Sequence, residues 1–452
     1  MNEQKDRLEP ASIKQWSFCD GLVFSCDFES GSIGQVRSLT NDTYELSLRD
    51  DNDNPKLPST FRAWWYVKAQ GLPASGVVLR ISRLGFKHLV LPVYSLDGRT
   101  WQHVPEAWVS MIDDTTMEVR MREPCASTLW IARTFPYTVQ DYLAYRATLS
   151  ANPHVQLREL GRSPYLDKPI DLLTITEHTD SCAKQTIWIQ ARTHAAEVGG
   201  SYMLEGLIDY LLTDAPQACE LRHHYIFKIV PMQNPDGVIL GNYRTNASSQ
   251  NLEPMWYFSK EPGETVPLQA RAPAENKIIN AGAMADVVRD TQHPVVLALN
   301  LHSSNEAPGT QAFFFPHFGP GASYSDTERD LWHTQIAFIQ SVASHYEGRI
   351  ESPPADGGRG FLGSDYPETW YWYNTQNRVN AITVETTYGK AGFDDWVTPV
   401  QWRALGKAAA LAIHEMGEPC TRHSDDRSMF CREASLTSEQ LQSRECERCR
   451  LE

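Results

Sequence analysis

Three short stretches of the chain carry residue types that bind metal ions and move protons. His194-Ala195-Ala196-Glu197 places an imidazole and a carboxylate three residues apart, just after an apolar run. His302 follows the apolar run 295–301, and Glu385 follows the apolar residues 382–384. Histidine nitrogens and carboxylate oxygens are ligands of Zn²⁺, and a set of three leaves one position for water. The residues therefore predict a zinc site with a free acid beside it.

Each of these signals also has a structural explanation. The helix dipole favours a glutamate in a first helical turn, and a histidine at the end of a strand is often structural. The joint occurrence favours a site, because the carboxyl ends of strands in an open α/β sheet border a common crevice. A charged Glu385 buried after an apolar run would also need a partner.

Around these residues the sequence resembles the M14 family of zinc carboxypeptidases, in particular its cytosolic carboxypeptidase branch. The stretches that carry the resemblance occur in the family's order and are 191–197, 230–238, 241–244, 301–303 and the segment that ends at Glu385. Residues 135–138, Phe-Pro-Tyr-Thr, and the β-rich segment before them also fit that branch, so that the resemblance covers roughly residues 20–415.

The resemblance implies a role for each of the matching residues. His194, Glu197 and His302 would bind one Zn²⁺, and Glu385 would take a proton from water and pass it to the leaving amine. Arg244 would stabilise the developing oxyanion. Arg192 either lines the entrance of the site or is solvated.

One stretch departs from the resembling family, whose members have Asp-x-Asn-Arg-x-Trp there. In those members the Asn-Arg pair binds the substrate's terminal carboxylate and the Asp orients a zinc histidine. This chain has Asn251-Leu252-Glu253-Pro254-Met255-Trp256. Proline has no N–H to donate and a glutamate repels a carboxylate, so we expect altered recognition of the substrate's end. Asn251 can still accept a hydrogen bond from His194.

Three functions remain open from the sequence. The first, which we favour, is a zinc-dependent hydrolase whose peptide or amide-containing small-molecule substrate presents a neutral or cationic group to Glu253. The second is a conventional C-terminal metallocarboxypeptidase in which Arg359 or Arg378 replaces the missing clamp. The third is a catalytically silent binding module on the same fold. The joint presence of the ligand residues, Arg244 and Glu385 argues against the third.

A glycine-rich segment, 357–366, is expected to form a mobile loop at the substrate pocket. Arg359 and Tyr366 are therefore candidate substrate-binding residues, together with Asn251 and Glu253. Tyr366 resembles a flexible tyrosine of the family that hydrogen-bonds substrate. The aromatic run 370–373 either walls the pocket or belongs to the core, and the core is the simpler explanation.

The order of apolar segments predicts an α/β protein with two domains and a tail. Residues 1–134 contain short extended segments separated by Gly, Pro and Asp-Gly turns, which is typical of an antiparallel β-sandwich. Strands and helices alternate over residues 135–416, which predicts a zinc-carboxypeptidase-like domain with a mixed central sheet flanked by helices. Residues 417–452 are polar and carry Cys420, Cys431, Cys446 and Cys449. These cysteines are either free thiols or the ligands of a structural zinc ion.

Composition limits the partners and the compartment. The 452 residues include 41 basic and 56 acidic ones, and the resulting net charge of -15 at pH 7 disfavours nucleic acid as a partner. The sequence has no apolar stretch of the roughly 20 residues that span a bilayer, and residues 1–7 do not resemble a signal peptide. Nine irregularly spaced cysteines are typical of reduced thiols. We expect a cytoplasmic protein without membrane or nucleic-acid partners.

Overall fold

The structure is a computed structural model that describes residues 15–122, 126–178, 184–261, 266–304, 309–316, 325–352, 364–375 and 379–417. The expected tail, apart from Gly417, lies outside these ranges. Arg359, Arg378 and most of the glycine-rich segment also lie outside them.

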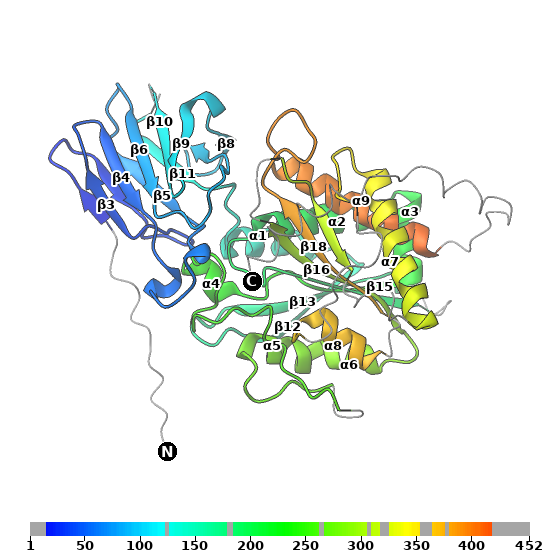
Figure 1. Cartoon of the computed structure of the whole chain (residues 1–452). Coiled ribbons are helices and arrows are strands. Elements are labelled where there is room, and N and C mark those ends of the chain that lie inside the picture. The colour runs from blue at the N-terminus through cyan, green and yellow to red at the C-terminus, as the bar shows by residue number, and fades with distance from the viewer. Residues whose placement is uncertain are drawn as a thin grey trace, which may run out of the picture. The chain divides into compact units, whose positions relative to one another are not determined.

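Two β-sheets make up the N-terminal part of the described chain (Figure 1). Their strand orders are β1-β2-β5-β11-β7-β8 and β3-β4-β6-β10-β9. The strands are β1 Gln15–Ser17, β2 Val23–Ser25, β3 Gln35–Ser38, β4 Thr43–Ser47, β5 Tyr66–Gln70, β6 Val77–Ser82, β7 Val93–Ser95, β8 Gln102–His103, β9 Val109–Asp113, β10 Thr116–Met121 and β11 Thr128–Ala132. Among these strands, β4 pairs with β6 in parallel and the other pairs are antiparallel.

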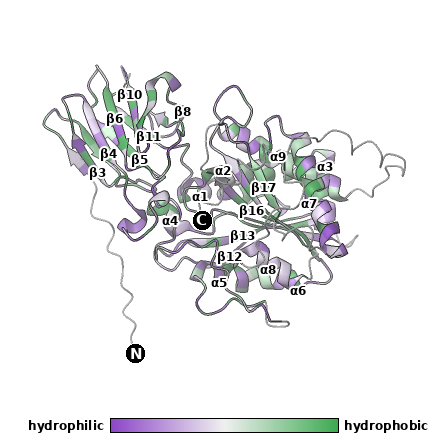
Figure 2. Cartoon of the chain, in the orientation of Figure 1, coloured by the Kyte–Doolittle hydropathy of each residue, from purple (hydrophilic) through white to green (hydrophobic). Residues whose placement is uncertain are grey.

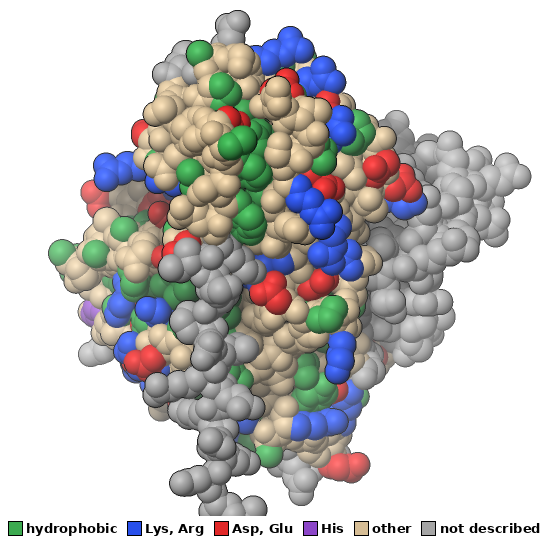
Figure 3. Space-filling model, turned by 90° about the vertical axis from the view of Figure 1, so that its left-hand side faces the viewer, with side chains coloured by type: hydrophobic (Ala, Val, Ile, Leu, Met, Phe, Trp, Pro, Cys, Tyr) green, Lys and Arg blue, Asp and Glu red, His purple; other side chains and the backbone are tan. Residues whose placement is uncertain are grey.

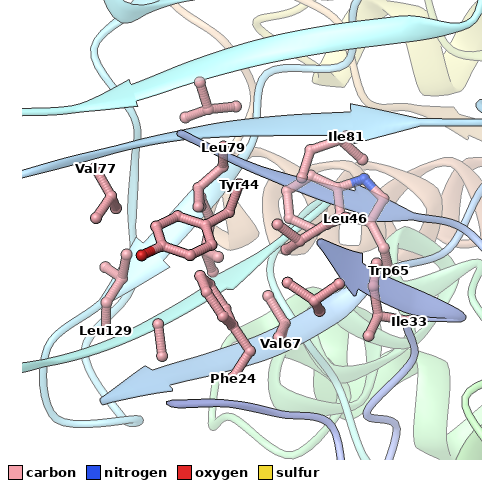
Figure 4. Close-up of a cluster of buried hydrophobic side chains, with 14 of the residues drawn as sticks. Phe24, Ile33, Tyr44, Leu46, Trp65, Val67, Val77, Leu79, Ile81 and Leu129 are labelled. Carbon is pink, nitrogen blue, oxygen red and sulfur yellow. The ribbon is translucent and has the colours of Figure 1, made fainter. Parts of the chain in front are cut away.

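One apolar core joins the two sheets, as Figure 4 shows. Phe24, Val67 and Leu129 enter it from the first sheet, and Leu46 and Leu79 enter it from the second. Burial of each such side chain contributes roughly 1.5–3 kcal/mol relative to exposure. The shared core confirms the predicted sandwich.

A mixed sheet forms the centre of the second domain, as predicted. Within the described residues it has seven strands in the order β12-β13-β15-β14-β16-β18-β17. These are β12 Val155–Arg162, β13 Pro169–Ile175, β14 Gln185–Ala191, β15 Tyr225–Val230, β16 Val295–Ser304, β17 Phe313–Pro316 and β18 Asn380–Thr387. The run β15-β14-β16-β18 is parallel, and the flanking pairs are antiparallel.

Helices cover both faces of this sheet. The α-helices are α1 Val139–Leu149, α2 Val198–Leu211, α3 Pro216–His224, α4 Pro235–Ile239, α5 Ala274–Ile279, α6 Ala285–Arg289, α7 Asp326–His345, α8 Pro367–Asn374 and α9 Pro399–Gly417. A π-helical turn, Asn280–Met284, joins α5 to α6. In Figure 1, α5, α6 and α8 lie on one face of the sheet, and α2 and α9 lie on the other. Figure 2 shows hydrophilic and hydrophobic residues on these helices, as expected where only one side of a helix is buried.

The surface seen in Figure 3 carries both signs of charge, with Lys and Arg interspersed among Asp and Glu. In the described part of the chain, no helix has the length and apolar character needed to cross a membrane.

Candidate metal centre

Three parallel strands bring the predicted ligands and the predicted acid, Glu385, to the same end of the sheet. His194 and Glu197 lie between the end of β14 and the start of α2, while His302 lies near the end of β16. β16 pairs with β18 in a register that places His302 opposite Glu385. Residues separated by more than 180 positions therefore meet at the carboxyl ends of neighbouring strands.

The ligand atoms of His194, Glu197 and His302 all lie within 4.8 Å of one another. Nδ1 of His194 lies 2.8 Å from Oε1 of Glu197, and Nδ1 of His302 lies 2.8 Å from Oε2 of the same carboxylate. The two Nδ1 atoms are 3.1 Å apart. All three side chains are buried, so these polar atoms are largely shielded from bulk water.

The outer nitrogen of each ring faces an oxygen. His194 Nε2 is 2.9 Å from Oδ1 of Asn251, as expected from the sequence. His302 Nε2 is 3.2 Å from Oε2 of Glu253, an ion-pair distance without hydrogen-bond geometry. An acceptor at Nε2 favours the tautomer protonated there, which turns both Nδ1 lone pairs inward. Two inward lone pairs beside a carboxylate form a donor set that fits Zn²⁺.

The electrostatics of the site also favour a cation. Burial and the nearby Arg244 lower the pKa of His194, which keeps the ring neutral. Although burial opposes it, the carboxylates of Glu253 and Glu197 raise the pKa of His302 well above its ordinary value. The histidines hold the pKa of Glu197 well below its ordinary value, again against burial. Positive charge is therefore stabilised between these side chains.

Glu385 lies beside the ligands as a free acid. Within the described structure its Oε2 atom is buried without a hydrogen-bond partner. Burial and the Glu197 carboxylate raise the pKa of Glu385 to about 8. A cation at the ligands would oppose that rise.

Arg244 flanks the site on its more exposed side. Its Nη1 lies 3.8 Å from Oε1 of Glu197, and 29% of the side chain is exposed. The guanidinium carbon lies 5.5 Å from the centre of the Phe61 ring. Burial lowers the pKa of Arg244, but Glu197 and further carboxylates raise it, with a net rise, so the group stays charged.

Arg192 is neither solvated nor at an entrance, which corrects both expectations from the sequence. Its guanidinium is buried and donates to the carbonyl oxygens of Ala195 and Tyr137 and to the hydroxyl of Ser201. Its backbone φ of 60° lies in the left-handed region. The residue thus stabilises the turn between β14 and α2 that carries two of the ligands.

Glu253 lies against His302, and its contact with substrate stays a prediction. Its Oε1 accepts a hydrogen bond of 2.9 Å from Asn300 Nδ2, which also donates to Glu368 Oε1 at 3.0 Å. Thr383 donates to the same Glu368 oxygen at 2.7 Å. Burial and the charge of Glu253 raise the pKa of Glu368 to about 7. The buried carboxylates of Glu253 and Glu368 thus both accept hydrogen bonds from the side-chain amide of Asn300.

Sequence reasoning missed Asn300, Thr383 and Glu368. The first two carry a usable signal, because each lies two residues before a site residue in a strand and therefore on the same face of the sheet. Glu368 lies in α8 and carries no such signal.

The remaining candidate, Tyr366, is half-buried and immediately precedes α8. Its role in substrate binding stays a prediction. Trp370 and Tyr371 are buried in the main core of the domain, which confirms the simpler explanation for them.

A hollow lies elsewhere, on the β-sandwich domain. Its volume is about 950 Å³, and its lining is polar and includes Arg37, Arg62, Arg83 and Lys87. None of the predicted ligands borders it, so the chemistry of the side chains, and not the size of the hollow, locates the site.

Two histidines, a glutamate and a free acid at the ends of parallel strands are typical of metal-dependent hydrolases. A family model described as zinc carboxypeptidase matches residues 142–401, and a second, the cytosolic carboxypeptidase N-terminal domain, matches residues 24–134. The chain belongs to the zinc carboxypeptidase family, in its cytosolic carboxypeptidase branch.

Curated relatives are consistent with this membership. Human cytosolic carboxypeptidase 6 is 31% identical over 254 residues, which cover 52% of this chain and 50% of the relative. Mouse cytosolic carboxypeptidase 2 is 28% identical, with 51% of this chain and 30% of the relative covered. Cytosolic carboxypeptidase 6 of Caenorhabditis elegans is 26% identical, with 69% and 68% covered. The chain thus spans half or less of the human and mouse relatives.

Solved structures share the fold. The metallo-carboxypeptidase of Burkholderia cenocepacia superposes with a TM-score of 0.70 at 23% identity, covering 87% of this chain and 98% of the other. That of Pseudomonas aeruginosa superposes with a TM-score of 0.69 at 21% identity, with the same coverage.

Proposed function

We propose that this chain is a zinc-dependent hydrolase of amide or peptide bonds, with His194, Glu197 and His302 as the zinc ligands. The observation that carries the proposal is the convergence of the two inward Nδ1 atoms and the Glu197 carboxylate in a buried position. Zinc bound there would supply a Lewis acid for the scissile carbonyl and acidify water.

The other two residues supply proton transfer and charge stabilisation. Glu385 takes a proton from the attacking water and returns it to the leaving amine, a role that suits a carboxylate whose buried Oε2 has no hydrogen-bond partner among the described residues. Arg244 directs a permanent positive charge at the developing oxyanion.

Recognition of the substrate's end is altered in this proposal. Pro254 stands where the resembling proteins have a clamp arginine, and it offers no donor. Glu253 and Glu368 add two carboxylates on the face of the sheet that bears His302. A terminal carboxylate would meet like charge there, so the favoured substrate is a peptide or small amide with a neutral or cationic end. A conventional carboxypeptidase that uses Arg359, Arg378 or another arginine as clamp is the alternative.

The names of the relatives include the word cytosolic, which supports the cytoplasmic location expected from the sequence. We retain that location as part of the proposal, with no nucleic-acid or membrane partner.

Metal analysis tests the zinc proposal directly. Purified protein should contain close to one zinc per chain, and His302→Ala should lose both metal and hydrolysis. Full activity in protein stripped of metal would show that the site does not act through zinc.

A panel of matched peptides tests recognition of the substrate's end. Substrates with amidated or lysine ends should be cleaved faster than those with glutamate ends. Strict dependence on a free terminal carboxylate would refute the altered recognition and leave zinc-dependent hydrolysis standing.

A further inference from the structure

A loop of the β-sandwich domain binds the backbone of the turn that carries Arg244. The loop is the short 3-10 helix Asp51–Asp53, and Asp51 itself is buried. Its carboxylate accepts hydrogen bonds from three successive backbone N–H groups, those of Tyr243 at 2.6 Å, Arg244 at 2.9 Å and Thr245 at 2.8 Å. The Thr245 hydroxyl donates to it as well, at 3.1 Å. Consecutive N–H groups that point to one spot form a concave anion site, which Asp51 fills.

The next residue holds the same turn on both sides. The Asn52 side chain donates to the carbonyl oxygen of Asn246 at 2.9 Å and accepts from Nδ2 of Asn242 at 2.9 Å. Its backbone N–H donates to Oδ1 of Asn242 at 3.1 Å. Asn52 has a φ of 53°, a left-handed conformation that costs on the order of 1 kcal/mol and persists where surrounding contacts enforce it.

The side chain of Arg244 also rests on the β-sandwich domain. Phe61, in the 3-10 helix Ser59–Phe61, presents its ring to the guanidinium. On the other side of the turn, the carbonyl oxygen of Tyr243 accepts a hydrogen bond of 2.9 Å from the backbone of Ala196, between the two ligands of that loop. The turn is therefore fixed between the first domain and the metal site.

We propose that the β-sandwich domain completes the active site, with Asp51 as the positioning residue for Arg244. The proposal rests on the role given to Arg244 in the proposed function. A guanidinium that must meet a developing oxyanion tolerates little displacement, because an error of about 1 Å in such a group lowers the rate about 100-fold. Asp51 makes none of its hydrogen bonds to a ligand side chain, so zinc binding should not depend on it.

The test is Asp51→Asn in the full-length, zinc-loaded protein. Asparagine keeps the size of the side chain but replaces one acceptor with an N–H₂ group, which faces the N–H donors of the turn. We expect kcat to fall about 10- to 100-fold while KM stays within about threefold and zinc content is unchanged. Asp53→Asn is the matched control, because Asp53 lies in the same loop with 53% of its side chain exposed, and it should keep the wild-type kcat.

A double variant distinguishes a positioning role of Asp51 from a general loss of structure. If Asp51 acts through Arg244, Asp51→Asn should have no further effect on kcat in an Arg244→Gln background. Losses in kcat that multiply in the double variant would overturn the positioning role. An Arg244→Gln variant with wild-type kcat would instead refute the role of Arg244 in the proposed function.

If thermal unfolding shows that Asp51→Asn does not fold, Phe61→Leu tests the same proposal. Leucine keeps an apolar side chain but removes the aromatic face, so kcat should fall about threefold, in line with a weak cation–π contact. An unchanged kcat in a folded Phe61→Leu variant would count against positioning by the β-sandwich domain.

Discussion

At the residue scale, the partners of the two proposed ligand histidines should determine how tightly zinc is held. His194 faces the neutral Asn251, whereas His302 faces the carboxylate of Glu253. A carboxylate behind an imidazole raises its basicity and fixes its orientation. Of the two histidines, His302 is therefore the one whose outer nitrogen faces a charged side chain.

Glu253→Gln should therefore lower zinc affinity about 10- to 100-fold, as loss of such partners does in other metal sites. Competition with a chelator of known affinity measures this without reference to activity. Glu368→Gln is the control, since Glu368 contacts Asn300 and Thr383 but no ligand in the described hydrogen bonds, and its zinc affinity should stay near wild type. Equal affinities in wild type and Glu253→Gln would favour a substrate-binding role for Glu253.

Glu385→Gln tests proton transfer. Glutamine matches the shape of glutamate but cannot accept a proton, so kcat should fall about 100- to 10,000-fold. Zinc content should be unchanged, because Glu385 is not among the three converging ligands. A variant that loses zinc together with activity would instead show that Glu385 helps to hold the metal.

A buried glutamate away from the metal makes stability depend on pH. Burial raises the pKa of Glu275 from 4.5 to about 7, although Asn246 donates to both of its oxygens. At pH values between 4.5 and about 7, Glu275 is therefore protonated in the folded state but ionised in the unfolded chain. Stability is lost as pH rises from 4.5 to 7, by at most about 3 kcal/mol.

Glu275→Gln removes this penalty. Urea unfolding should show the variant about 1–3 kcal/mol more stable than wild type at pH 8, with little difference at pH 4.5. Glu347→Gln, at an exposed glutamate, should show no such dependence. An equal gain at both pH values would mean that the charge of Glu275 is not the cause.

At the element scale, apolar runs in the sequence predicted the parallel strands that carry the site. The runs before His194, His302 and Glu385 correspond to β14, β16 and β18. These are buried on both faces and read as continuous apolar runs. The predicted ligands lie at the ends of these strands, and the structure brings them within 4.8 Å of one another.

Other elements could not be predicted in this way. The outer strand β12 is polar and partly exposed, and the strand β17 has four residues. The contacts of Asp51 with the Arg244 turn and of Glu253 with His302 depend on how distant loops pack, which the spacing of residues along the chain does not encode.

Helices α2 and α9 approach each other closely enough to exclude a methyl group. A Cβ added at Gly206 would lie 2.1 Å from the carbonyl oxygen of Arg403, and one at Gly406 would lie 1.9 Å from that of Met203. Both neighbours are backbone atoms, so the helices themselves would have to move apart.

Gly206→Ala should therefore destabilise the protein by about 1–3 kcal/mol in chemical unfolding, despite the higher helix propensity of alanine. Gly309→Ala is the control, because a Cβ there meets no atom within 4 Å. A stabilised Gly206→Ala variant would show that the two helices separate at little cost.

At the scale of the whole molecule, the chain divides between a domain with its own apolar core and a domain that carries the ligands. We propose the boundaries expected from the sequence, with the first domain at residues 1–134 and the second at 135–416. The Asp51 and Asn52 contacts cross this boundary and are buried or partly buried. Such contacts couple the stability of one domain to that of the other.

Zinc binding should therefore stabilise both domains together. A ligand that binds only the folded state adds about 4 kcal/mol when its concentration is 1,000 times its Kd. Removal of zinc with a chelator should lower the midpoint of the entire thermal unfolding transition. Circular dichroism of the whole protein and protease cleavage within each domain should show the same shift. His302→Ala should not respond to zinc or chelator. A sandwich that melts at the same temperature with and without zinc in the wild type would show that the two domains fold independently.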